Sequence, residues 1–85
     1  MDEKALAQKM IEFIRTRVLR DPSLEIAEET PLLSSGLVDS FALVEVLLYL
    51  EEITRRKIYQ EDVSLDDLDS VREMLLSAER VGRAQ

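Results

Sequence analysis

The 85-residue chain contains no histidine and no cysteine. Without histidine, no side chain has an unperturbed pKa near neutrality that would suit general acid–base catalysis. Without cysteine, there is no thiolate nucleophile, no disulfide and no cysteine-based zinc site. Carboxylates and hydroxyls remain, in a chain that buries only a small core when it folds. The sequence therefore argues against an enzyme that works by itself.

Positive charge is also scarce. The chain has 18 acidic and 11 basic residues, and residues 21–53 contain eight acidic residues and no basic one. Such a surface repels phosphate backbones and anionic lipids, so we expect neither a nucleic-acid nor a membrane partner. The apolar runs at residues 41–44 and 46–50 are far too short to span a bilayer, and no signal peptide is recognisable. We expect a soluble, cytoplasmic monomer.

Composition and periodicity predict one helical domain over residues 1–85. Apolar residues make up 46% of the chain and charged residues 34%, a globular composition. Apolar positions recur at helical spacing in three segments. We predict helices over residues 3–19, over residues 39–54, and from Asp69-Ser70 to a stop at Gly82.

The segment between the first two predicted helices lacks a clear period. Residues 23–38 contain Pro31, Ser34, Ser35 and Gly36, which favour a loop. Connections of this length are usually functional in a small domain. Residues 61–68 suggest at most one short helical turn. The sequence therefore predicts an all-α bundle of three principal helices and one short helix.

The predicted helix over residues 39–54 has two apolar faces. At 100° per residue, one face carries the residues expected in the core: Leu43, Val46, Leu47, Leu50 and Ile53. A second face, beyond Ser40, carries Phe41, Val44 and Leu48, bordered by Glu45 and Glu52. Either the first helix or the long loop covers this second face, or it is an exposed docking surface for a basic partner. The acidic run over residues 21–53 also has two interpretations, either a solvated face or a docking surface.

Ser40 begins the second helix directly after Asp39, a favourable N-cap residue. A phosphodiester on this hydroxyl would be stabilised by the helix dipole. Asp69-Ser70 is a second pair of the same kind, which we interpret as a helix cap and nothing more. Only the first pair follows a long loop and precedes a helix with a spare apolar face.

The run from Thr30 to Glu45 resembles the acyl carrier and peptidyl carrier proteins. Their motif, Gly-x-x-Asp-Ser followed by a large apolar residue, is met by Gly36, Asp39, Ser40 and Phe41. The order of helices and loops is similar over nearly the whole chain. The resemblance therefore implies a small four-helix carrier-protein bundle.

The resemblance also implies a function that needs no catalytic residue. Family members carry 4′-phosphopantetheine on the motif serine, here Ser40, and its thiol holds an acyl or aminoacyl group as a thioester. Asp39 belongs to the attachment motif. The implied partners are a phosphopantetheinyl transferase, a loading ligase for acyl or aminoacyl groups, and downstream acyl-processing enzymes. The docking residues implied by position are Phe41, Val44, Glu45, Leu48 and Glu52.

Two departures narrow the resemblance. Fatty-acid carriers commonly have an acidic residue two positions after the serine, where this chain has Ala42. The second helix also ends in the unusually basic run Arg55-Arg56-Lys57. These features are closer to stand-alone carriers of aminoacyl or unusual acyl units, a role that the length of the chain also favours.

Three alternatives remain at the level of sequence. The chain could be an unmodified carrier-like scaffold or regulator, which would not need the Ser40 hydroxyl. It could hold a carboxylate-only hydrolase or metal site on Asp62, Asp66, Asp67 and Asp69, although these lack the spacing and glycine of a calcium loop. A helical DNA-binding module is disfavoured by the charge.

Overall fold

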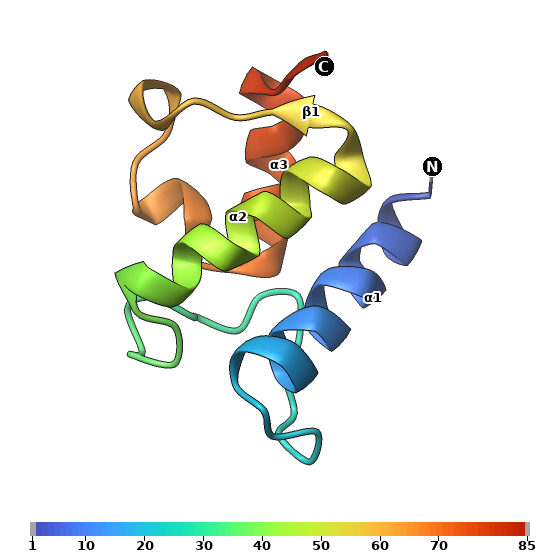
Figure 1. The fold of residues 1–85 in the computed structure, drawn as a ribbon, viewed down its shortest axis with the longest axis vertical. Helices are drawn as coiled ribbons and strands as arrows, with labels where there is room; N and C mark the ends of the chain where they lie inside the picture. Colours follow the sequence, from blue (N-terminus) through green and yellow to red (C-terminus); the bar gives the residue numbers. More distant parts are fainter. Residues whose placement is uncertain (1, 85) are drawn as a thin grey trace.

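The computed structural model describes residues 2–84, which form a mostly helical fold with three α-helices (Figure 1). The helices are α1 (Glu3–Phe13), α2 (Ser40–Thr54) and α3 (Val71–Val81). A π-helical segment, η1 (Ile14–Val18), continues α1, so helical backbone covers almost the whole range predicted for the first helix. The two end positions of the predicted 1–85 domain lie outside the described residues.

Each α-helix begins at a polar cap, as the sequence predicted for the second and third helices. Asp2, Asp39 and Ser70 accept hydrogen bonds from backbone amides in the first turns of α1, α2 and α3. These bonds satisfy amides that have no partner inside the helix. The caps therefore fix where α2 and α3 start, within two residues of the predicted positions.

One hydrophobic core joins the three helices and the long loop. It contains Met10 and Ile14 from the first helical segment, and Leu43, Val46 and Leu50 from α2. From α3 and the loop come Val71, Met74, Leu75, Ala78, Ile26, Leu32 and Val38. The loop is thus part of the core and does not simply cross the surface.

Residues 19–39 contain neither a helix nor a strand, as predicted for the long loop. The loop leaves the end of the first helical segment, passes the start of α3 and reaches the start of α2 (Figure 1). The backbone amide of Arg72 donates to the Glu28 carbonyl at 2.9 Å, and the Leu32 amide donates to the Asp69 carbonyl at 2.7 Å. These bonds fasten the middle of the loop to α3.

A two-stranded antiparallel ribbon, which the sequence did not predict, closes the other end of the molecule. β1 (Arg56–Lys57) pairs with β2 (Arg83–Ala84), with Arg56 opposite Ala84. Arg55 ends α2 in the left-handed conformation, with φ 58°, and turns the chain into β1. A side chain at Gly82 would meet the Ala78 carbonyl and the Arg56 side chain, so this close approach requires glycine.

Two separate 3-10 turns, η2 (Gln60–Asp62) and η3 (Asp66–Leu68), replace the single short helix of the predicted bundle. The prediction of at most one helical turn between residues 61 and 68 was therefore wrong. Asp67 explains part of this difference, because its carboxylate accepts a bond from the Ser64 amide at 2.9 Å and closes a local turn.

Candidate functional site

Ser40 is the first residue of α2, and its side chain is exposed. Asp39 has extended backbone angles, and its carboxylate accepts a hydrogen bond from the Ala42 amide at 2.8 Å. The cap places the Ser40 hydroxyl at the positive end of the helix dipole, which favours a negatively charged group there. The geometry therefore suits a phosphate ester on Ser40.

The turn before Ser40 depends on the conformation of Gly36. This glycine has φ +84°, and its amide donates to the Leu33 carbonyl at 3.1 Å. No neighbouring atom lies within 4 Å of the position that a Cβ would occupy, so backbone angle rather than space selects glycine. The next buried residue, Val38, donates to the Leu32 carbonyl at 2.9 Å and closes the turn.

Asp69 holds this turn from the start of α3. Its Oδ1 atom accepts from the amides of Leu33 at 2.7 Å, Ser34 at 2.9 Å and Leu32 at 3.1 Å. The Ser34 hydroxyl and amide, together with the neighbouring amides, hold the pKa of Asp69 below its usual value. Helix α3 is capped by Ser70, whose hydroxyl accepts from the Glu73 amide at 3.1 Å. The interpretation of Asp69-Ser70 as a cap and nothing more was therefore wrong for Asp69.

The second apolar face of α2 is exposed, as one of the two sequence interpretations required. Phe41 is 90% exposed, Val44 56% and Leu48 60%, and we call these three residues the exposed strip. The residues predicted for the core face are buried or half-buried. Large apolar side chains that stay exposed together on one helix face often mark a site of protein contact.

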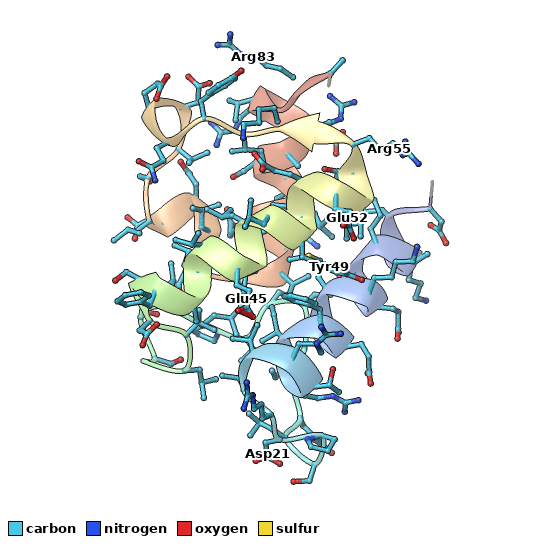
Figure 2. The ribbon with its side chains drawn as sticks, viewed as in Figure 1. Asp21, Glu45, Tyr49, Glu52, Arg55 and Arg83 are labelled. Carbon is cyan, nitrogen blue, oxygen red and sulfur yellow. The ribbon has the colours of Figure 1, made fainter. Side chains whose placement is uncertain are left out.

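Acidic residues border the exposed strip on the side of α2 that faces α1. Figure 2 shows Glu45, Tyr49 and Glu52 following one another along this side. Both glutamates are exposed, while the Tyr49 ring stacks on Phe13 with ring centroids 4.1 Å apart. The stack anchors this side of α2 against α1 and leaves the two carboxylates at the border. Sequence reasoning missed Tyr49, because the stacking needs the packing of two helices.

An apolar pocket lies on another side of α2. It has a volume of about 350 Å³ and includes Leu43 and Leu47, which face the segment that follows β1. Its other lining residues are Ile58, Gln60, Val63, Ser64, Leu65 and Leu68. Leu43 lies three positions after Ser40, so the pocket is within about one helical turn of Ser40. The sequence analysis did not predict this pocket, because it forms only when residues 58–68 pack beside α2.

Three of the four acidic residues of segment 62–69, all except Asp66, have separate structural partners described here. Asp62 pairs with Arg83 at 3.5 Å, Asp67 pairs with Arg80 at 3.6 Å, and Asp69 holds the loop. The backbone amide of Ser64 is the main cause that lowers the pKa of Asp67. Among residues 2–84, no three acidic side chains come close enough to hold a metal ion.

Comparisons with known proteins leave the function to be argued from the site. No family model, no curated protein and no solved structure matches the chain. Within the part of the chain that the structure describes, no helix is both long enough and apolar enough to cross a bilayer.

Proposed function

We propose that this chain is a carrier protein, with 4′-phosphopantetheine attached to Ser40 through a phosphodiester. The observation that carries the proposal is the position of Ser40. Its hydroxyl is exposed at the capped start of α2, between a fastened loop and the exposed strip. A small fold of this kind, with two 3-10 turns in place of a short third helix, would then be a variant of the carrier-protein bundle.

Loading requires an external enzyme, because the site itself supplies only the acceptor. The Ser40 oxygen would attack the phosphorus next to pantetheine in coenzyme A, and 3′,5′-ADP would leave as the new P–O bond forms. The hydroxyl proton would pass to a base of the phosphopantetheinyl transferase. Asp39 caps α2 with one carboxylate oxygen at 2.8 Å and stands beside the reacting residue, so it would help to orient the acceptor.

The bound group supplies the thiol on which the cargo is carried as a thioester. This explains how a chain without histidine or cysteine takes part in acyl transfer. A loading ligase and downstream acyl-processing enzymes would meet the exposed strip, whose acidic neighbours Glu45 and Glu52 favour basic partner surfaces. Ala42 and the basic run after α2 favour an aminoacyl or unusual acyl cargo over a fatty-acid chain.

A second candidate, an unmodified scaffold or regulator, would use the same exposed strip. The high exposure of Phe41, Val44 and Leu48 supports it equally well, since protein contact alone requires no cofactor. The two candidates differ in one respect only, which is whether the Ser40 hydroxyl is needed.

Intact-protein mass spectrometry after incubation with coenzyme A, Mg²⁺ and a broad-specificity phosphopantetheinyl transferase separates these candidates. We expect wild type to gain one phosphopantetheine and Ser40→Ala to gain none. Ser23→Ala is a control, because Ser23 is another exposed serine, in the loop before α2, and its hydroxyl donates to the nearby Asp21 carboxylate at 2.6 Å. We expect this control to be loaded. A folded, unmodified wild type that gains no mass would favour the scaffold.

Replacing Ser40 should leave the fold unchanged, because its side chain is exposed. Thermal unfolding followed by circular dichroism checks this point. If Ser40→Ala melted far below wild type, loss of loading would report unfolding and not the loss of the acceptor.

A further inference from the structure

Three consecutive amides of the loop converge on one carboxylate oxygen from another part of the chain. The amides belong to Leu32, Leu33 and Ser34, and the acceptor is Oδ1 of Asp69, at 2.7–3.1 Å. Amides that point together in this way are typical of the first turn of a helix, where a local side chain usually accepts them. Here the acceptor lies 35 to 37 positions later in the sequence. Asp69 is therefore a long-range cap on the turn.

Few residues separate this turn from Ser40, and hydrogen bonds fix their positions. Leu32, at the beginning of the turn, accepts a hydrogen bond from the Val38 amide at 2.9 Å, and both side chains are buried in the core. After Val38, only Asp39 precedes Ser40, and Asp39 is fixed by its own bond to Ala42. A shift of the turn would therefore move the residues that lead directly into α2.

Besides the three amides, the carboxylate of Asp69 interacts with the Ser34 hydroxyl, which belongs to the same turn. Ser70 caps α3 in its place. Two main-chain bonds, from Leu32 to the Asp69 carbonyl and from Arg72 to the Glu28 carbonyl, also connect the loop with α3. Because these two bonds do not involve the side chain, removing the carboxylate would loosen the turn without detaching the loop.

We infer that Asp69 is a positioning residue for the modification of Ser40: by capping the turn at residues 32–34, it holds the attachment segment in the geometry that the phosphopantetheinyl transferase recognises. The inference rests on the proposed function. It assigns to the start of α3 a role in a reaction that takes place on α2, with no contact between Asp69 and the reacting atoms required.

The test compares Asp69→Ala with Asp69→Asn and with a matched control, Asp67→Ala. The asparagine side chain keeps an oxygen acceptor for the amides, so it should rescue much of the effect. Asp67 caps a different turn, at Ser64, and pairs with Arg80. The Asp67→Ala variant therefore shows how much amide exchange and loading change when a capping carboxylate near α3 is lost without any effect on the turn at residues 32–34. Each variant is examined by amide hydrogen exchange and by the steady-state kinetics of loading.

For Asp69→Ala we expect the amides of Leu33 and Ser34 to exchange at least about tenfold faster, as the loss of hydrogen bonds to a charged acceptor implies. The Ala42 amide should also exchange faster, while Met74 in α3 follows the control variant. We expect kcat/KM for loading to fall at least about fivefold at temperatures where the variant is folded, since small misplacements of reacting groups are costly. Asp69→Asn should lie between Asp69→Ala and wild type.

Two results would overturn the inference. One is loading of Asp69→Ala at the wild-type rate, whatever the exchange data show. The other is an equal acceleration of exchange at Leu33, Ala42 and Met74, which would mean that Asp69 only stabilises the fold as a whole. A wild type that cannot be loaded at all would count against the proposed function, and the exchange data would then decide by themselves whether Asp69 positions the segment.

Discussion

Alanine substitutions at two leucines of α2, only two positions apart, should affect different properties, one the stability of the fold and the other partner binding. Leu50 is completely buried in the core, whereas Leu48 is 60% exposed in the strip. Truncating a buried leucine to alanine removes its transfer free energy and leaves a cavity, at a cost of about 2–5 kcal/mol. A domain of this length has a total stability of about 4–13 kcal/mol. Leu50→Ala should therefore remove a large part of it.

Leu48→Ala should change the free energy of unfolding by less than about 0.5 kcal/mol, because its site is mostly exposed and is already surrounded by water. Urea unfolding of both variants measures this contrast directly. In thermal unfolding, each 1 kcal/mol corresponds to about 4–8 °C in a domain of this size, so the two variants should melt at clearly different temperatures.

For partner binding, we expect the Leu48 substitution to have the larger effect and the Leu50 substitution the smaller one. If the exposed strip docks the phosphopantetheinyl transferase, Leu48→Ala should cost about 1–2 kcal/mol of binding free energy, a loss of about 5- to 30-fold in affinity. Leu50→Ala should bind normally at temperatures where it is folded. Equal destabilisation by the two substitutions would refute the assignment of Leu48 to an exposed face, and unchanged transferase binding by Leu48→Ala would refute the docking role.

Two other predictions concern charge. Replacing Glu45 and Glu52 by lysine should weaken binding to a basic partner surface and slow association at low salt, because both carboxylates border the exposed strip and are exposed. Stopped-flow measurements of the association rate at two salt concentrations check this prediction. Equal rates for wild type and the double variant would exclude these residues from the interface. The pKa values of Asp67 and Asp69 are held below their usual range, so the stability that these carboxylates provide is complete above about pH 4 and is lost as the pH falls through their folded-state pKa values. Wild type should therefore lose more stability than Asp69→Asn between about pH 5 and pH 2, measured by urea unfolding, and parallel losses would contradict the role of that carboxylate.

The helices and the division of α2 into two faces could be predicted because they depend on local signals. Caps at Asp39 and Ser70 mark helix starts, and apolar spacing along one helix determines which residues can share a face. The exposure of Phe41 and the burial of Val46 follow from that spacing once a core exists on one side only.

Most of the features that the sequence did not reveal depend on contacts between different segments. The bond from Asp69 to the amides of residues 32–34 joins positions that no local pattern connects. The ribbon of β1 and β2 has only two residues in each strand, too few to show alternation. Glu51 is a third example, because it looks like a surface acid yet is buried, accepting from the Ile58 amide at 2.8 Å and pairing with Lys57.

Peptide mapping of the loaded protein tests the central claim most directly. Residues 21–53 contain no lysine or arginine, so complete trypsin cleavage leaves Ser40 in one peptide from Asp21 to Arg55, separate from Ser64, Ser70 and Ser77. Fragmentation of that peptide also distinguishes Ser40 from Ser23, Ser34 and Ser35. We predict that the phosphopantetheine is found on Ser40 alone. Attachment to any other serine, or no attachment to folded wild type, would contradict the proposal that this chain is a carrier protein modified at the start of α2.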